Sequence, residues 1–368
     1  MGQNPPYDPG QLPDDGRLHG RDITDKASDA DGSAGRAGPG DTLWVLGNLT
    51  IDDVILPDGT TAMGLCGGNV TYAALGARLW RSRVALAARI GPDFPAAHLE
   101  RLGRAGLELN LVQVTVPSIH NRILYEPDDV RRLTTWAGSG SHHDQSIRAI
   151  ELPAGIGHAR ACHVASMPIE IQAQLVGRLR RKGVRMISLD PHEDYIAGHE
   201  DALLALVRGV DLFLPSRAEA RLLYGRDDPE AAARAFAAAG PKVVVIKLGP
   251  AGSIVCGPDG ADHHVPAVSV SVVDPTGAGD AYCGGFLAAY HDRPDAAVAA
   301  VHGAISASFA VERRGALALI EIDPAESRDR LEQALAAMTS TVIATDRPPL
   351  PSTTVVAPPA KEPRHAHG

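Results

Sequence analysis

Short apolar stretches alternate with helical ones through the middle of the chain, and this alternation limits the fold more than any other feature. Strands are predicted at 162–165, 184–189 and 210–214, and helices at 169–182, 201–208 and 218–224. Repeated strand–helix–strand units form a mostly parallel sheet covered by helices on both faces. Buried strands at 42–48 and 84–90 extend the pattern toward the N-terminus. The predicted fold class is therefore α/β, with ligands expected at the carboxyl ends of the strands.

Residues 109–136 break this pattern. Their apolar runs are short and are separated by Pro117, Asn121 and the pair Asp128-Asp129. Such spacing is typical of antiparallel strands rather than strand–helix units. We therefore expect a second, smaller sheet from this region.

A turn rich in small residues lies at 272–286. Val272-Val273 predicts a short strand, and a helix is expected after Asp280. Gly277 and Gly279 can adopt backbone angles closed to other residues, so we expect the turn amides and the helix N-terminus to suit a phosphate or an oxyanion. Asp280 alone could be a helix cap. A carboxylate beside a phosphate cradle, however, is what phosphoryl transfer to a hydroxyl requires.

The heptapeptide Asp274-Pro275-Thr276-Gly277-Ala278-Gly279-Asp280 resembles the C-terminal signature of the ribokinase or PfkB-type carbohydrate kinases. The resemblance implies a ribokinase-like three-layer α/β/α domain over 41–338, with a small β-sheet lid built from parts of 50–65 and 109–136. It implies an ATP-dependent kinase acting on a hydroxyl of a small sugar, sugar acid, cyclitol or nucleoside. ATP and Mg²⁺ are the implied cofactors, with K⁺ as an optional addition beside Asp274, and the lid is the implied homodimer contact.

Functional residues carry over at matching positions. The resemblance makes Asp280 the catalytic base and the amides of Gly277, Ala278 and Gly279 the anion hole. The implied acceptor-binding residues are Asp52, Gly67, Gly68, Asn69, Tyr72 and Arg122. The implied nucleotide-binding residues are Ser216, Lys247, Gly249, Gly252, Thr276, Gly277, Gly279 and Gly315. The implied metal-binding residues are Glu219 and Asp274.

Two positions depart from the family pattern. Tyr72 stands near the place of a family Asn, which makes a nucleoside or a cyclitol as credible as a pentose. Ser216 replaces the Asn of an Asn-x-x-Glu motif, and Ser216 with Glu219 also fits a helix capping box. Lys247 could meet either a phosphate or a carboxylate. On the predicted lid, Asn121, Arg122 and Glu126 could face the ligand or solvent.

Composition limits the remaining functions. The formal net charge of -9 argues against a nucleic-acid partner. No apolar run is long enough to span a bilayer, and the expected location is cytoplasmic. The four cysteines and the pairs His142-His143 and His263-His264 lack metal-ligand spacing. Residues 1–40 and 339–368 are predicted to be disordered tails.

Two other classes of protein compete with a kinase. A catalytically weak ligand-binding or regulatory protein could keep this fold, and only Tyr72 and Ser216 point to it. A Rossmann dehydrogenase is disfavoured because Gly277-x-Gly279 lacks a third glycine and comes late in the chain.

Overall fold

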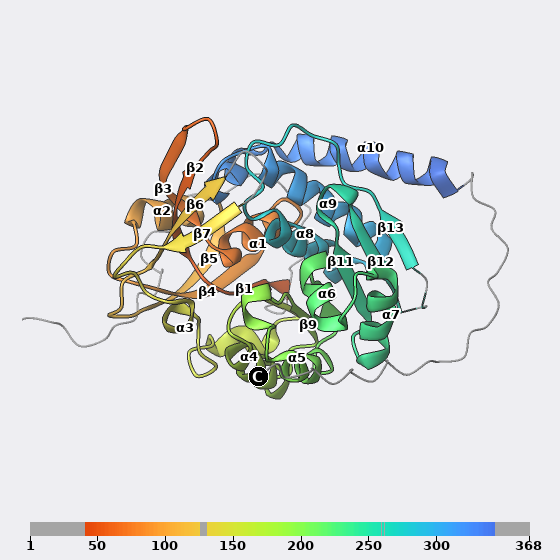
Figure 1. The fold of residues 1–368 in the computed structure, drawn as a ribbon, viewed down its shortest axis with the longest axis horizontal. Helices are drawn as coiled ribbons and strands as arrows, with labels where there is room; N and C mark the ends of the chain where they lie inside the picture. The colour runs from red at the N-terminus through yellow and green to blue at the C-terminus, as the bar shows by residue number, and fades with distance from the viewer. Residues whose placement is uncertain (1–40, 126–130, 259, 261, 343–368) are drawn as a thin grey trace, which may run out of the picture.

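The described chain is built around one nine-stranded sheet (Figure 1). The computed structural model describes residues 41–125, 131–258, 260 and 262–342, so Glu126 and most of the two predicted tails lie outside it. Along the sheet, the strand order is β13 (Asp262–Val265), β12 (Ser253–Cys256), β11 (Val243–Lys247), β10 (Leu212–Phe213), β9 (Met186–Leu189), β8 (Ala161–Val164), β1 (Leu43–Leu46), β4 (Val84–Ile90) and β5 (Leu107–Gln113). Among the described strands of this sheet, only β12 runs antiparallel to its neighbours, β11 and β13. The predicted α/β class is confirmed.

Both faces of the sheet are buried in its centre, because the central strands send apolar side chains to both sides. In β1, Leu43 and Val45 join one apolar cluster while Trp44 and Leu46 join the other. The first cluster is covered by α1 (Asn69–Arg78), α2 (Ala96–Arg104), α8 (Ala278–Asp292), α9 (Ala296–Val311) and α10 (Pro324–Val342). The second is covered by α4 (Ile169–Arg181), α5 (Glu200–Val207), α6 (Arg217–Tyr224) and α7 (Pro229–Ala239). The result is the expected three-layer arrangement.

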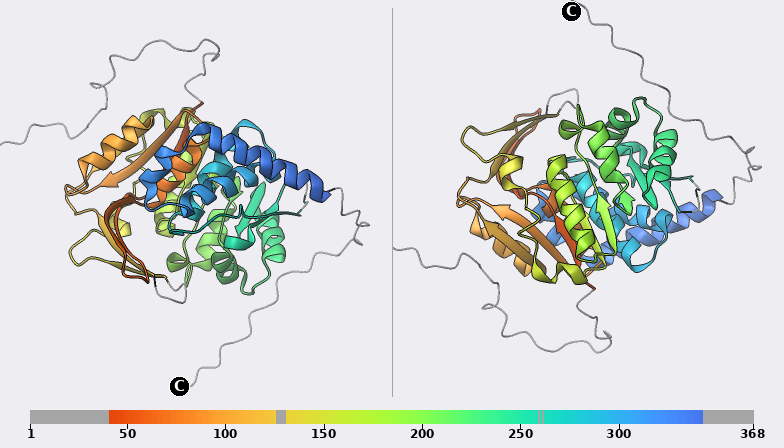
Figure 2. Two further views of the ribbon diagram at one scale, coloured as in Figure 1. Left: turned by 90° about the horizontal axis from the view of Figure 1, so that it is seen from above. Right: turned by 90° about the horizontal axis from the view of Figure 1, so that it is seen from below.

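A second sheet of four strands stands at one end of the molecule (Figures 1 and 2). Its order is β3 (Thr61–Gly67), β2 (Thr50–Ile55), β6 (Ile119–Tyr125) and β7 (Arg131–Thr135). The inner face has its own small apolar cluster, made by Val54, Ile123 and Tyr125. We call this sheet the lid. Short α3 (His142–Gln145) follows it in the chain.

The prediction that 109–136 is antiparallel was wrong in two places. Strand β5 pairs parallel to β4 at the edge of the main sheet, because α2 returns the chain in the same direction. Strand β6 pairs parallel to β2, and only β3 and β7 are antiparallel to their neighbours. Strands β2 and β6 are separated by a long crossover, which permits the parallel pairing that the short apolar runs did not suggest.

Two boundaries also differ from expectation. Val272 and Val273 form no strand, since their side chains are 63% and 41% exposed and have no partner strand to cover them. Instead, the amides of Val273 and Asp274 donate to the carbonyl of Val311 at the end of α9. Helix α10 continues to Val342, beyond the predicted domain end at 338.

Among the described helices, none combines the length and the hydropathy that a bilayer span needs. All four cysteines are buried and free.

Candidate active site

The 274–280 turn leads into α8, and its first residue contacts the end of α9. Gly277 is the N-cap of α8 and has φ 75°. A side chain there would collide with the ring of Tyr72, which packs directly on the glycine. Both the backbone angle and the close contact therefore require glycine at this position.

Asp280 occupies the first turn of α8, as predicted, and is neither fully buried nor fully exposed. The residues from Gly277 to Gly279 have the same intermediate exposure, so the turn is accessible. The amide of Ala278 already donates to the carbonyl of Pro275 at 3.3 Å. The amides of Gly279 and Asp280 open the helix, where geometry supplies no intrahelical acceptor.

Asp274 anchors the turn to the lid. Its Oδ1 accepts hydrogen bonds from the Tyr125 hydroxyl at 3.0 Å and from the Thr276 amide at 2.9 Å. The hydroxyls of Tyr125 and Thr276 are also 2.6 Å apart. Asp274 is 1% exposed, and its Oδ2 is buried without a hydrogen-bond partner among the described residues. That second oxygen is a ready ligand for a cation.

Asp52 lies on the inner face of the lid, at β2. Its Oδ1 accepts from the Thr50 hydroxyl at 2.8 Å and from Asn121 Nδ2 at 3.0 Å. Its Oδ2 lies so close to Gly67 that a Cβ there would overlap it. The structure thus brings together Asp52 and the first glycine of the predicted acceptor-binding pair.

Tyr72 shows that the predicted acceptor and phosphate residues surround one place. Burial raises the pKa of the Tyr72 phenol well above its ordinary value, and the carboxylates of Asp52, Asp274 and Asp280 raise it further. These carboxylates come from the lid, the turn and α8, so all three elements converge on this ring.

Two predicted acceptor-binding side chains are engaged elsewhere. Arg122 is exposed on the outer face of the lid, where its guanidinium stacks over Trp136 at 4.1 Å from the ring centre. Asn69 uses its amide inside the protein: Oδ1 accepts from the Asn48 amide, and Nδ2 donates to Ser166. Gly68 has φ 96° and leaves no room for a side chain against the carbonyl of Asn48.

Ser216 and Glu219 form the capping box that their spacing allows. Ser216 Oγ accepts from the Glu219 amide at 3.2 Å, and Glu219 Oε2 accepts from the Ser216 amide at 2.6 Å. Burial raises the pKa of Glu219 to about 7, and the nearby Asp190 carboxylate adds to this. A negative charge on Glu219 beside Asp190 is therefore unfavourable unless a further cation binds nearby. A carboxylate in this position suits a metal ligand.

Lys247 ends β11 beneath the turn. Its Nζ donates to Asp190 Oδ1 at 2.7 Å and lies 3.5 Å from Cys283 Sγ. It is also 3.5 Å from the place where a Cβ on Gly279 would stand. Burial alone would lower the pKa of Lys247, but the Asp190 charge outweighs it and holds the ammonium protonated.

His163, Asp190 and Cys283 place ligand atoms within 4.8 Å of one another, although nothing in their sequence spacing suggested it. The ammonium of Lys247 already supplies positive charge to two of them. Burial lowers the pKa of His163 to about 3, and Lys247 lowers it further. We interpret this cluster as a charged support under the turn rather than a metal centre.

The remaining residues predicted to bind nucleotide, Gly249, Gly252 and Gly315, lie in different surroundings. Gly249 (φ 60°) is exposed and open, while Gly252 (φ 90°) packs against the backbone of 265–267. Gly315 lies against Leu65 of the lid strand β3. The structure therefore gives Gly252 and Gly315 packing roles.

Three residues of the site were missed or undervalued by sequence reasoning. Tyr125 and Asp190 were assigned no role, and Asn121 was left open between ligand and solvent. A signal existed for Asn121, since it alternates with buried Ile119 and Ile123 on one face of β6.

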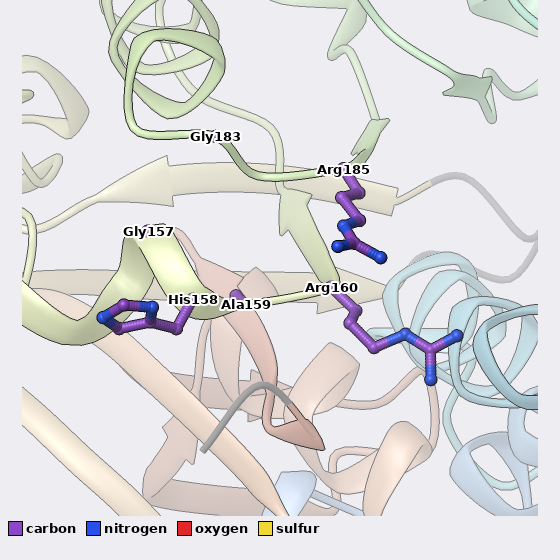
Figure 3. Close-up of a pocket in the computed structure, with 6 residues that line it drawn as sticks. All are labelled: Gly157, His158, Ala159, Arg160, Gly183 and Arg185. Atoms are coloured by element: carbon purple, nitrogen blue, oxygen red, sulfur yellow. The ribbon is translucent and has the colours of Figure 1, made fainter. Parts of the chain in front are cut away.

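An open cavity lies at the amino ends of β8 and β9 in the main sheet (Figure 3). It is lined by Gly157, His158, Ala159, Arg160, Gly183 and Arg185, which precede β8 and β9. Because ligands of parallel α/β sheets bind at the carboxyl ends of strands, this cavity is separate from the candidate site.

Comparison with known proteins agrees with this geometry. Residues 53–323 match the model of the pfkB family carbohydrate kinases. The chain is 34% identical over 254 residues to a cytidine kinase from Thermococcus kodakarensis, which covers 67% of this chain and 88% of the relative.

Solved structures share the fold at low identity. A Burkholderia thailandensis nucleoside kinase in complex with inosine has a TM-score of 0.66 at 19% identity, covering 80% of this chain and 97% of that one. An E. coli protein described as ribokinase II, in complex with ATP and Mg²⁺, has a TM-score of 0.67 at 19% identity, covering 80% and 99%. The chain is a kinase with the ribokinase fold and belongs to the pfkB family.

Proposed function

We propose that this kinase transfers the γ-phosphoryl group of ATP to a hydroxyl of a small ribose-containing or related alcohol, with Asp280 as general base. The observation that carries the proposal is the position of Asp280: it is accessible, in the first turn of α8, directly after the Gly277 turn. A nucleoside is the favoured acceptor because the relatives above include a cytidine kinase and a nucleoside kinase. A free sugar, a sugar acid or a cyclitol are the other acceptors that this site chemistry suits.

The proposed step conserves charge and atoms. The acceptor oxygen attacks the γ-phosphorus while its proton passes to the Asp280 carboxylate. The bond from the γ-phosphorus to the bridging oxygen breaks, and ADP leaves. Amides at the start of α8 and the ammonium of Lys247 beneath Gly279 stabilise the negative charge on the transferring group.

Two cation sites fit the residues present. Glu219 and Asp190 provide two buried carboxylates whose negative charges repel each other. Because Mg²⁺ would relieve this repulsion, Glu219 would hold it, directly or through water. Bound Mg²⁺ would neutralise phosphate charge. The unpartnered, buried Oδ2 of Asp274 would suit a monovalent cation such as K⁺.

The rival interpretation, a weak or non-catalytic binder, loses its two hints. Ser216 is explained by the capping box and Tyr72 by its packing on Gly277. Neither departure therefore requires a loss of turnover.

The experiment is an acceptor panel with ATP and Mg²⁺, analysed for phosphorylated product. Cytidine, inosine, ribose, a ketodeoxy sugar acid and myo-inositol represent the acceptor classes. We expect phosphorylation of at least one of them by the wild type and its loss in Asp280→Asn. ADP release that does not depend on any alcohol would overturn the proposal, as would a product yield that Asp280→Asn leaves unchanged.

A further inference from the structure

Asn121 has a buried hydrogen-bond acceptor to which no described residue donates. The residue is 5% exposed, on the inner face of the lid strand β6. Its Nδ2 donates to Asp52 Oδ1 at 3.0 Å, while its Oδ1 has no hydrogen-bond partner among the described residues. The orientation of the amide is fixed by chemistry, because only the NH₂ group can donate to a carboxylate.

The neighbours of Asn121 on the same face offer no donor to it. Ile123 and Val54 are apolar members of the lid cluster. Tyr125, two residues beyond Ile123, directs its hydroxyl to Asp274 and Thr276. A buried carbonyl oxygen without a donor is unfavourable, and one retained beside a binding carboxylate indicates a donor on a ligand.

Asp52 does not offer all of its acceptor sites to a ligand. Its Oδ1 already accepts from Thr50 and from Asn121, which uses both lone pairs of that oxygen. A second acceptor close to Asp52 would give each of two neighbouring hydroxyls its own acceptor. Asn121 lies opposite Asp52 in the register of β2 and β6, and its amide oxygen supplies that acceptor.

We propose that Asn121 Oδ1 accepts a hydrogen bond from a second substrate hydroxyl, next to the one held by Asp52, and so selects acceptors with a vicinal diol. A ribofuranose ring, in a ribonucleoside or as free ribose, has this diol. The inference rests on the proposed function, because it assigns specificity to the same acceptor site. Asn121 acts in recognition and takes no part in proton transfer, which belongs to Asp280 on α8.

The test compares a ribonucleoside with its 2′-deoxy and 3′-deoxy forms, in the wild type and in Asn121→Leu. The leucine has a similar size and removes the acceptor. For the wild type we expect kcat/KM and affinity to fall about 10- to 100-fold when the hydroxyl facing Asn121 is absent. In Asn121→Leu, the ratio of kcat/KM, and of affinity, between the ribonucleoside and that deoxy form should approach one. Selectivity for the other hydroxyl, held by Asp52, should persist as an internal control.

Matched controls separate this effect from general damage. Thr134→Ala also removes a polar group from the lid, but from an exposed residue of β7, and should leave both ratios unchanged. Repeating the series with ribose and 2-deoxyribose distinguishes a nucleoside from a free sugar as the source of the diol.

Binding calorimetry keeps the inference testable without turnover. If no acceptor is phosphorylated, the proposed function fails, but the affinity ratios still report on Asn121. Equal wild-type affinity for the ribo and both deoxy forms would overturn the inference even if Asn121→Leu did not fold. Ratios that Asn121→Leu leaves unchanged would overturn it as well.

Discussion

At the scale of single residues, opposite charges are paired beneath the 274–280 turn. Asp190 and the mostly buried side chain of Lys247 are 2.7 Å apart, and both charges act on the pKa of Glu219. Removing one member of such a pair leaves an uncompensated buried charge, whereas removing both does not.

Lys247→Met should therefore destabilise the fold by about 3 to 5 kcal/mol, and the double variant Lys247→Met/Asp190→Asn by clearly less. Urea unfolding measures this difference. Turnover should remain low in both variants, because neither has the ammonium beside Gly279. A double variant with wild-type kcat would show that the ammonium serves stability alone.

His163 gives a prediction for acid stability. Burial lowers its pKa to about 3, below the ordinary value of 6.5, so the folded protein keeps it neutral while the unfolded chain takes up a proton below pH 6.5. This stability is complete above pH 6.5 and is lost as the pH falls toward 3. From pH 7.5 to 5 the loss is about 2 kcal/mol.

Between pH 7.5 and 5, the free energy of unfolding of His163→Gln should fall by about 2 kcal/mol less than that of the wild type, whatever the stability of the variant at pH 7.5. Denaturant unfolding at the two pH values measures it. Equal pH dependence in wild type and variant would remove His163 as the cause.

The neighbours Asn121 and Arg122 show where prediction from sequence ends at this scale. Both are polar residues of one predicted strand, and the resemblance selected Arg122 as the ligand contact. The structure turns Asn121 toward Asp52 and Arg122 toward Trp136. Sequence fixes the alternation of a strand, but which face meets the site depends on pairing with β2, a strand far away in the chain.

At the scale of elements, the side chain of Tyr125 joins the lid to the 274–280 turn. Tyr125 belongs to β6, and its hydroxyl reaches Asp274 and Thr276 of the turn. Its ring packs with Val54 and Ile123, so the two parts of the residue serve different elements.

Tyr125→Phe should keep the lid cluster but loosen the turn. Losing the hydroxyl leaves Asp274 Oδ1 with one fewer donor, which costs about 1 to 3 kcal/mol. We expect faster hydrogen exchange at 274–280 and kcat about tenfold lower. Tyr224→Phe, which removes an exposed hydroxyl bonded to Arg226, is the matched control. Unchanged exchange in Tyr125→Phe would show that the lid does not order the turn.

Prediction of elements succeeded where local signals sufficed. The units from β8 to α6 were predicted because the hydrophobic period is a local property. Helix α7 was missed although Asp228 caps it and Pro229 opens it, both recognisable start signals. The parallel pairing of β2 with β6 could not be inferred, because no local pattern reports which distant strand is the neighbour.

At the scale of the whole molecule, the candidate site residues come from two sheets. The main sheet brings Asp190, Glu219 and Lys247 together at the carboxyl ends of β9, β10 and β11. The lid brings Asp52 and Asn121. In the proposed function the acceptor residues come early in the chain and the phosphate residues late.

The outer side of the lid leads to a prediction about assembly. Met63 of β3 is 56% exposed and Trp136, directly after β7, is 41% exposed. The lid to which these strands belong stands at one end of the molecule (Figure 2). We propose a homodimer through this face. Sedimentation should give twice the monomer mass for the wild type and a shift toward monomer for Met63→Glu. A monomeric wild type at all concentrations would refute the proposal.

The central claim is best tested by single-turnover phosphoryl transfer in Asp280→Asn, with binding of ATP and acceptor measured in parallel. The account predicts that transfer slows by about 10²- to 10⁴-fold, because the general base is gone. Both ligands should still bind with nearly wild-type affinity. A variant that transfers phosphate at close to the wild-type rate would contradict the assignment of Asp280, and with it the proposed mechanism.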